Sequence, residues 1–449
     1  MEKIRPRTLS GFMELLPEPQ SQMDAVMSVL RETYARFGFT NIDTPVLEAS
    51  EVLLAKGGGE TEKQIYRFEK GDTDLAMRFD LTVPLAKYVA MNYGSLAFPF
   101  RRCQIGKVYR GERAQRGRFR EFYQADVDVI GDGSLDASNE AEMVAIICET
   151  FRRLGLSRFQ VRINNRKLLN ALFSWLGMEE NASAVMGSID KLDKIGADKV
   201  LELLTDTVGV PADKAKKLMD IISAEDPNAV LEAIRHEDER LEAGVQELRK
   251  VTDLLPAFGV PADKWRLDLT IARGLDYYTG TVYETTLLDY PEVGSVCSGG
   301  RYDDLAGYYT DKKLPGVGVS IGVSRLFFIL QDQGLLTESA IRPPCDALIV
   351  PMGEVLPYAV SAATTLRSAG IRSQVYMEQK KTKAKFAYAD KLRVPYAVII
   401  GEDEMNAGTV SVKDLRNGTQ ETLTPEEAAK KILAGLPEAG APVQEKERK

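Results

Sequence analysis

Apolar positions recur with a helical period near the start of the sequence. One stripe at the spacing i, i+3, i+4 and i+7 consists of Met23, Val26, Met27 and Leu30. This period predicts a helix that begins after Pro19, buries one face and ends near Gly38. The following segment, FTNIDTPVLE, is typical of a strand interrupted at Pro45, because proline cannot donate a hydrogen bond to a neighbouring strand. We therefore expect a helix followed by a broken strand.

A second region of helical period covers residues 170–255, which are also rich in charge. Its clearest apolar stripe consists of Leu241, Val245 and Leu248. The pattern predicts a set of helices here. The single histidine of the chain, His236, falls within the polar sequence RHED of this region. We expect it on a helix surface in contact with solvent.

Short apolar runs alternate with helical patterns beyond the pair Pro343–Pro344. The expected strands cover 347–350, 373–376 and 396–400, and the expected helices cover 356–369 and 383–392. Such alternation is typical of an α/β domain with a mostly parallel sheet. We place this domain at 345–436. Residues 437–449 are mostly polar and have the composition of a disordered tail.

Composition excludes several classes of chemistry. The 449 residues carry a formal net charge of −8, so no overall basic surface for nucleic acid is expected. A single histidine argues against a His-rich metal cluster, and we expect no metal site built from protein side chains. The four cysteines form no CxxC pair and fit core positions in a reducing compartment. We expect neither a signal peptide nor a membrane span, and a location in the cytoplasm.

Arginine is concentrated in one short segment of this acidic chain. Seven arginines lie within residues 101–120: Arg101, Arg102, Arg110, Arg113, Arg116, Arg118 and Arg120. Guanidinium groups bind phosphate oxygens in bidentate fashion, so the cluster suggests an anion site. A solvated, charged hairpin is the alternative. The apolar pattern predicts antiparallel strands at 103–110 and 118–130, joined by the loop GERAQRG.

Side-chain alternation along the second of these strands separates two faces. The polar face consists of Arg118, Arg120, Phe122, Gln124, Asp126 and Asp128. The apolar face consists of Phe119, Tyr123, Ala125, Val127 and Val129. We expect the apolar face to pack on a core. The polar row then forms the floor for an elongated ligand, such as a nucleotide placed end to end with an amino acid.

Three segments resemble the class II aminoacyl-tRNA synthetases. FTNIDTPVLE resembles their motif 1, YRGER with GRFREFYQADVDVIG resembles motif 2, and GVGVSIGVSRLFFIL resembles motif 3. Their order along the chain is that of the family. Two further stretches, RGLDYYTGTVYE at 273–284 and SGGRYDDL at 298–305, are similar to the motifs specific to histidyl-tRNA synthetases.

The resemblance implies a fold and an activity. The fold is an α+β catalytic domain built on an antiparallel sheet at 1–335, with a helical insertion at 170–255 and a C-terminal α/β anticodon-binding domain. The reaction joins L-histidine to ATP, giving histidyl-adenylate and pyrophosphate, and then transfers the histidyl group to tRNA(His). Mg²⁺ is expected with ATP, bridging its phosphates. A homodimer is expected because motif 1 builds the dimer interface in this family. The basic sequence KKTKAK at 380–385 is a candidate for contact with anticodon phosphates, and a solvated helix start is the alternative.

The resemblance also assigns residues to ATP. Arg110 is implied to bind the α-phosphate, Glu112 to contact adenine and Phe122 to stack on it. Arg118 and Arg325 are implied to hold the outer phosphates. Arg273 is implied to lie on the α-phosphate, where its fixed charge stabilises the transition state of nucleotidyl transfer.

Six residues are implied to bind histidine. Asp128 and Tyr278 serve the two ring nitrogens, with Tyr277 lining the pocket. Asp80 and Thr82 take the α-amino group, and Gln124 lies near the amino acid backbone. Many relatives have glutamate where this chain has Asp80 and Asp128, so a water molecule is an alternative to direct contact at these two positions. An ordinary core or helix-capping role remains the alternative for the tyrosines and for Asp80.

Two other functions compete with this interpretation. A related regulatory subunit of ATP phosphoribosyltransferase binds histidine without charging tRNA, but it lacks the anticodon-binding domain. A synthetase for another amino acid, such as proline, threonine or glycine, is disfavoured by RGLDYYTGTVYE.

Overall fold

The computed structural model describes residues 3–55, 62–113, 115–271, 277–436 and 440–445. They form two compact units. The first contains residues 1–14, 23–336 and 442–449, and the second contains 15–22 and 337–441. Arg273 lies outside the described residues.

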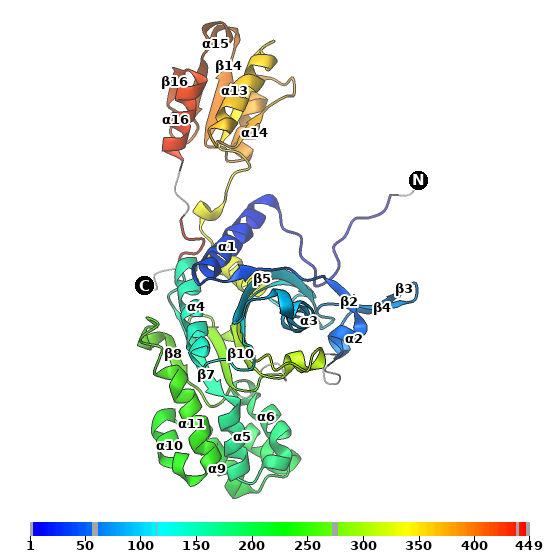
Figure 1. The fold of residues 1–449 in the computed structure, drawn as a ribbon. Helices are drawn as coiled ribbons and strands as arrows, with labels where there is room; N and C mark the ends of the chain where they lie inside the picture. Colours follow the sequence, from blue (N-terminus) through cyan, green and yellow to red (C-terminus); the bar gives the residue numbers. More distant parts are fainter. Residues whose placement is uncertain (1–2, 56–61, 114, 272–276, 437–439, 446–449) are drawn as a thin grey trace. The chain divides into compact units, whose positions relative to one another are not determined.

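An eight-stranded sheet forms the centre of the first unit (Figure 1). Its strands in spatial order are β1 (Thr40–Asn41), β5 (Phe100–Tyr109), β6 (Glu121–Ile130), β11 (Gly316–Gly322), β10 (Ser295–Tyr302), β9 (Thr281–Leu287), β7 (Phe159–Asn165) and β8 (Trp265–Leu267). The six strands from β5 to β7 are antiparallel, whereas β1 and β8 pair in parallel at the two edges. The expected antiparallel sheet is confirmed, with two short parallel strands added.

Helices pack on both faces of this sheet. On one face, α4 (Ser138–Leu154) accepts a hydrogen bond of 2.7 Å at the Glu140 carbonyl from the Tyr283 hydroxyl of β9. On the other face lies α3 (Thr82–Asn92), and the Leu81 carbonyl that precedes it accepts a 3.2 Å hydrogen bond from Arg102 of β5. The Arg102 face of the sheet therefore has α3 above it (Figure 1).

The predicted N-terminal helix and broken strand are both present. The helix is α1 (Pro17–Arg36), and all four residues of its predicted stripe are buried. It ends before Gly38, whose φ of +75° suits glycine. Pro45 separates β1 from β2 (Leu47–Ala49), which pairs with β4 (Thr73–Met77) and through it with β3 (Arg67–Lys70). Two further helices of this unit are α2 (Ser50–Leu53) and α12 (Val323–Asp332).

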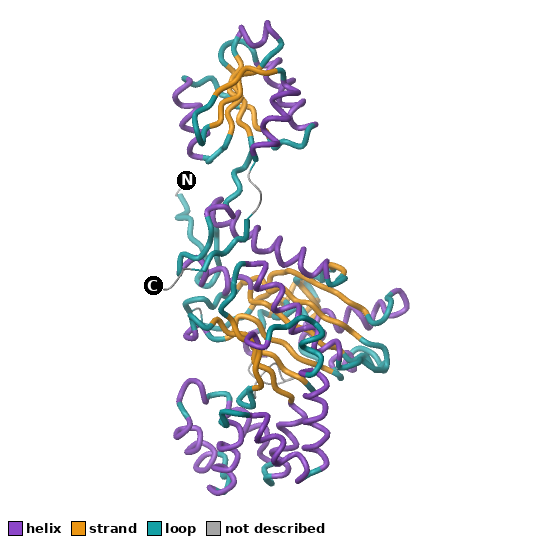
Figure 2. The backbone as a smooth tube through the Cα atoms, turned by 90° about the vertical axis from the view of Figure 1, so that its left-hand side faces the viewer, coloured by secondary structure: helices purple, strands orange, loops and turns teal. Residues whose placement is uncertain are grey.

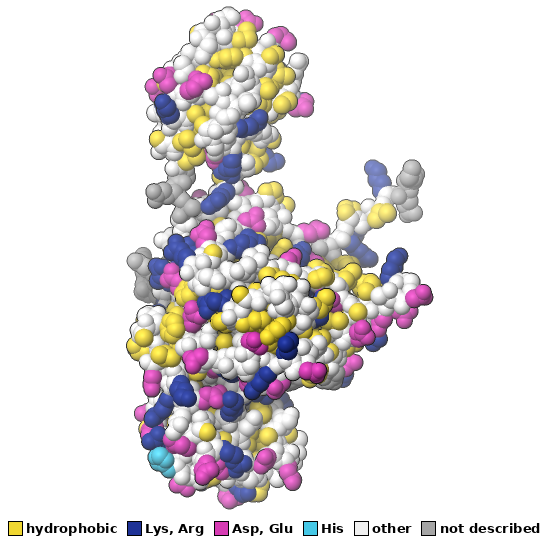
Figure 3. Space-filling view, in the orientation of Figure 1, with side chains coloured by type: hydrophobic (Ala, Val, Ile, Leu, Met, Phe, Trp, Pro, Cys, Tyr) yellow, Lys and Arg dark blue, Asp and Glu magenta, His cyan; other side chains and the backbone are white. Residues whose placement is uncertain are grey.

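The region 170–255 is helical, as predicted. Its helices are α5 (Arg166–Trp175), α6 (Ala182–Ile189), α7 (Leu192–Ile195), α8 (Ala197–Glu202), α9 (Ala212–Ile222), α10 (Pro227–Ile234) and α11 (Glu239–Thr252). α11 approaches α5 closely at Gly244, where an added Cβ would lie 2.8 Å from the Cα of Leu168. The side chain of His236 is 71% exposed, as expected, and is the cyan group in Figure 3.

The second unit contains a five-stranded mixed sheet. Its order is β13 (Ser373–Val375), β12 (Ala347–Pro351), β14 (Tyr396–Ile400), β15 (Val410–Asp414) and β16 (Gln420–Leu423). The first three strands are parallel, but β15 and β16 add antiparallel pairs, so the prediction of a mostly parallel sheet is wrong for this half. The helices α13 (Leu356–Ser368), α14 (Thr382–Lys391), α15 (Glu402–Ala407) and α16 (Pro425–Gly435) flank the sheet on both sides (Figure 2).

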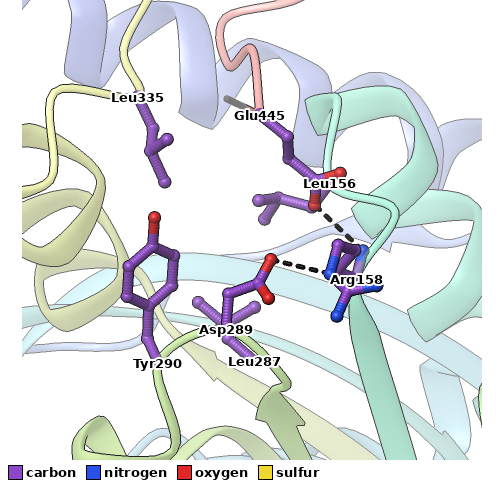
Figure 4. A pocket seen from close by; sticks show the side chains of 7 residues that line it. All are labelled: Leu156, Arg158, Leu287, Asp289, Tyr290, Leu335 and Glu445. Carbon is purple, nitrogen blue, oxygen red and sulfur yellow. Dashed lines mark hydrogen bonds and ion pairs between the residues drawn. The ribbon is translucent and has the colours of Figure 1, made fainter. Parts of the chain in front are cut away.

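The prediction of a disordered tail is wrong for residues 440–445. Val443 is 3% exposed, and its amide donates a 3.1 Å hydrogen bond to the Leu154 carbonyl. The Glu445 carboxylate accepts a 2.8 Å hydrogen bond from the Ser157 amide. It accepts a second, of 2.9 Å, from the Arg158 amide (Figure 4). Two buried apolar side chains, Pro442 and Val443, and these hydrogen bonds hold the segment.

All four cysteines are buried and free of disulfides, as expected for core positions. Among the described residues, no helix combines the length and apolar character that crossing a membrane requires.

Candidate functional site

The hairpin β5–β6 carries most of the candidate residues. Its register pairs Arg102 with Asp128, Gln104 with Asp126, and Val108 with Phe122. Residues paired in this way share one face of the sheet. The predicted strands are confirmed with altered bounds, because β6 begins at Glu121 and leaves Arg118 and Arg120 in the preceding segment. The predicted alternation is confirmed from residue 122 onward, since Ala125, Val127 and Val129 are buried in the core.

Asp80 lies at one end of this face, at the start of α3. Its Oδ1 accepts a 3.0 Å hydrogen bond from the Val83 amide, which is the geometry of a helix N-cap. Its Oδ2 accepts from the Tyr277 hydroxyl at 3.4 Å. Burial raises the pKa of Asp80 to about 6, although the Val83 amide and the charge of Arg110 oppose the rise. The carboxyl group therefore accepts a backbone hydrogen bond at the start of α3 and is also a buried titratable group.

Thr82 and the two tyrosines lie next to Asp80. Thr82 is the first residue of α3 and is buried, and its side chain bonds to Tyr277. Burial raises the pKa of Tyr278, and the nearby carboxylates of Asp128, Asp126 and Asp80 raise it further. Tyr278 is consequently a neutral hydroxyl surrounded by acidic groups.

Asp128 takes part in a buried ion pair. Its Oδ2 lies 2.8 Å from Nη2 of Arg102, and its Oδ1 accepts a 2.6 Å hydrogen bond from the Tyr302 hydroxyl. Burial alone would lower the pKa of Arg102, but the Asp128 and Asp126 carboxylates raise it above its usual value. Burial has the opposite effect on Asp128, whose pKa it raises, and the positive charge of Arg102 opposes that rise. Arg102 is 0% exposed, so its charge is balanced by side chains rather than by water.

Arg110 and Phe122 lie further along the same face. Nε of Arg110 donates a 3.1 Å hydrogen bond to the Phe79 carbonyl, which orients the guanidinium. Its Cζ lies 5.2 Å from the centre of the Phe122 ring. Phe122 is half-buried and leaves ring surface for stacking. Gln124 lies between Phe122 and Asp128 in the row. Its side-chain amide donates a 2.9 Å hydrogen bond to the Ser320 hydroxyl.

Glu112, Arg118 and Arg325 form a group of charges beyond Phe122. Arg118 lies 3.7 Å from the Glu112 carboxylate. Arg325, in the first turn of α12, donates to the Val293 carbonyl. Burial lowers the pKa of Arg325, and the positive charge of Arg118 lowers it further. Two arginines that repel each other beside one carboxylate form a site that an anion would stabilise.

All the predicted site residues except Arg273 are described, and they lie on the hairpin or on the elements that face it. Three further residues of the site are not predicted as such from the sequence: Arg102, Asp126 and Tyr302. Arg102 belongs to the arginine cluster and Asp126 to the polar row, so both carry a signal. Only the β5–β6 register shows that Arg102 lies opposite Asp128. Tyr302 falls within SGGRYDDL, but its partner cannot be read from the sequence.

The basic cluster 380–385 is only partly available to a ligand. Lys385 is 8% exposed, and its ammonium donates a 2.6 Å hydrogen bond to the Pro351 carbonyl. The Lys385 ammonium is therefore held by the backbone of the second unit. Lys380, Lys381 and Lys383 are exposed.

Comparisons with known proteins find matches over most of the chain. A family model described as histidyl-tRNA synthetase matches residues 11–326, and one described as an anticodon binding domain matches residues 346–435. A histidine–tRNA ligase of Clostridium tetani is 50% identical over 433 residues, covering 96% of this chain and 98% of the relative. One of Stenotrophomonas maltophilia is 46% identical over 464 residues, covering 96% of this chain and all of the relative.

Solved structures agree as well. The crystal structure of histidyl-tRNA synthetase from Nostoc sp. PCC 7120 has a TM-score of 0.86 and 38% identity, covering 97% of this chain and 100% of that one. A protein from Bacillus halodurans C described as an ATP phosphoribosyltransferase regulatory subunit/histidyl-tRNA synthetase has a TM-score of 0.73 and 23% identity, covering 89% of this chain and 99% of that one. The second likeness shows the fold alone.

Proposed function

The chain belongs to the histidyl-tRNA synthetase family and joins histidine to tRNA with the use of ATP, and from this premise we propose that the Arg102 face of β5–β6 is where histidyl-adenylate forms. The observation that carries the proposal is the single row on β6. Phe122 lies near Arg110 at one end, and Asp128 lies among buried polar groups at the other. This order suits ATP and histidine placed end to end.

The ATP end is served by cations and one aromatic ring. We assign Arg110 to the α-phosphate, Phe122 to stacking on adenine and Glu112 to the adenine edge. Arg118 and Arg325 hold the outer phosphates. The hydrogen bond from Arg110 to the Phe79 carbonyl supports this role, because it fixes the guanidinium before ATP binds. The mutual repulsion of Arg118 and Arg325 is relieved when phosphate charge lies between them.

The histidine end is served by buried groups. Asp80 and Thr82 take the α-ammonium group, Gln124 lies near the carboxylate that reacts, and Tyr277 closes the pocket wall. Asp128 and Tyr278 take the ring nitrogens. The burial of Asp80 and Asp128 supports this assignment, since buried carboxylates favour an amino acid whose N–H groups match them over one that lacks those groups.

Arg273 and Mg²⁺ complete the proposed reaction. Arg273 lies outside the described residues. Arg273 is proposed to place positive charge on the α-phosphate as the carboxylate oxygen of histidine attacks it and pyrophosphate leaves. Mg²⁺ is proposed to enter with ATP. It neutralises phosphate charge, and Mg²⁺ in such sites is held by phosphate oxygens, water and at most one or two carboxylates.

The wider assignments follow from the same family. We propose a class II catalytic domain at 1–335, with its insertion at 170–255, and an anticodon-binding domain at 345–436 that contacts tRNA(His). We also propose a homodimer in the cytoplasm. The regulatory-subunit alternative is less supported, because the family match includes the anticodon-binding domain.

The test is ATP–pyrophosphate exchange with each of the amino acids in turn. Exchange with histidine alone supports the proposal. Exchange with no amino acid would favour the regulatory alternative, and exchange with proline, threonine or glycine would favour a synthetase of different specificity.

A further inference from the structure

Arg102 lies at the centre of a buried group of charges. Its side chain is 0% exposed and lies 2.8 Å from Asp128 and 3.9 Å from Asp126. Its Nε and Nη1 atoms have no hydrogen-bond partner among the described residues. Asp126 and Asp128 are 2% and 3% exposed. One guanidinium therefore faces two carboxylates from which water is excluded.

The two carboxylates differ in how they are engaged. Asp128 has Arg102 at one oxygen and the Tyr302 hydroxyl at the other. Asp126 has an oxygen, Oδ1, with no hydrogen-bond partner among the described residues. A buried carboxylate oxygen without a donor is costly, so a donor from a ligand would be strongly favoured at this position.

The position of Asp126 places this oxygen among the proposed histidine-binding groups. Asp126 lies two residues from Gln124 and two from Asp128 on the same face of β6, opposite Ser320 of β11. Tyr278 experiences the charges of Asp128, Asp126 and Asp80 together. The carbonyl oxygen of Gln124 is also buried without a partner among the described residues. These unpaired acceptors lie on the same face of β6.

We propose that Asp126 is a further histidine-binding residue, whose Oδ1 shares with Asp128 the hydrogen bond from one imidazole N–H, and that Arg102 is the positioning residue for both carboxylates. The proposal rests on the proposed function, since it assumes that histidine occupies this pocket. The site contains three buried acidic groups, Asp80, Asp126 and Asp128. Arg102 is the fully buried cation near them. A ligand that brings an α-ammonium group and ring N–H donors completes the pairing.

The test compares Asp126→Asn with the wild type in ATP–pyrophosphate exchange at varied histidine and varied ATP. We expect the KM for histidine to rise on the order of tenfold or more, with the KM for ATP changed less than about threefold. The matched control is Asp132→Asn, at an exposed aspartate just after β6 that accepts from the Tyr93 hydroxyl, and it should change neither constant. An unchanged histidine KM in Asp126→Asn would overturn the proposal.

A second measurement separates ligand contact from a structural role. Asp126→Ala removes the carboxylate and leaves space for a methyl group on the ring. Histidine methylated on one or the other ring nitrogen should support little exchange in the wild type. One of the two should regain activity in Asp126→Ala relative to histidine itself. If both methylated forms stay equally poor in the variant, Asp126 does not face the ring. Wild-type exchange with histidine tests the proposed function separately.

Discussion

The Tyr302 hydroxyl donates a 2.6 Å hydrogen bond to Oδ1 of Asp128 across β11. Two glycines of β11 make room for this pair. A Cβ at Gly316 would lie 2.3 Å from the Tyr302 ring, and a Cβ at Gly318 would lie 2.1 Å from the Asp128 carboxylate. The contact joins the segment SGGRYDDL to the β6 row, so two separate sequence motifs meet at one carboxylate.

Replacing Tyr302 with phenylalanine should weaken histidine binding. The variant keeps the ring but leaves one oxygen of Asp128 without its donor, and a hydrogen bond to a charged group contributes about 1.5–3 kcal/mol. We expect a several-fold or greater rise in the KM for histidine and a loss of stability in urea unfolding, with ATP binding little changed. A histidine KM equal to that of the wild type would show that this hydrogen bond does not shape the pocket.

Replacing Arg325 with alanine should affect ATP rather than histidine. Arg325 is held beside Arg118 despite the repulsion that, with burial, lowers its pKa. That arrangement is useful where phosphate charge binds between the two. We expect the KM for ATP to rise about tenfold or more. Arg325→Lys, which keeps the charge but not the planar group, should lie between the alanine variant and the wild type. The idea fails if Arg325→Ala raises the histidine KM instead.

Replacing Asp80 with asparagine should change how stability depends on pH. Burial raises the pKa of Asp80 from 3.8 to about 6, so the folded state holds its proton more tightly than the unfolded state does. The wild type therefore loses stability through this group as the pH rises from about 4 to about 6, and no further above that. The amide side chain of the variant cannot ionise, but its oxygen can still accept the hydrogen bond from the Val83 amide.

The stability of Asp80→Asn relative to the wild type should accordingly increase by about 3 kcal/mol between pH 4 and pH 7, measured by urea unfolding at each pH. The conservative control is Asp132→Asn. Its stability relative to the wild type should not show this increase between pH 4 and pH 7. A pH-independent difference for Asp80→Asn would mean that Asp80 titrates normally in the folded chain.

Local periodicity explains how much of the fold the sequence could predict. Met23 and Val127 lie on apolar stripes of the expected period, and both are buried in the expected elements. The β6 row is predictable because alternation is a local property. The pairing of Arg102 with Asp128 depends on register between two strands, and register is fixed by the packed sheet rather than by either strand alone.

Weak or non-local signals account for the failures. β16 is a strand of four residues, three of them exposed, and β15 alternates valines with Ser411 and Lys413, so both patterns are fainter than the continuous apolar run of β12. Lys385 falls in a basic run that predicts a solvated helix start, yet its ammonium reaches the Pro351 carbonyl. Val443 lies in a short tail without periodic apolar positions, and its place against Leu154 makes it a core residue.

Replacing Val443 with aspartate should release the segment 440–445. Val443 is buried, and full burial of such a side chain contributes about 1.5–3 kcal/mol. Burying a charge at this position is costly, so the segment would detach and expose the amides of Ser157 and Arg158, which now donate to Glu445. Hydrogen–deuterium exchange of peptides containing these two amides should become faster.

Gln444→Ala is the matched control, because Gln444 is exposed and its amide, which donates to the Leu335 carbonyl, is retained. Equal exchange at Ser157 and Arg158 in Val443→Asp and the wild type would mean that the segment contributes nothing to the order of this part of the first unit.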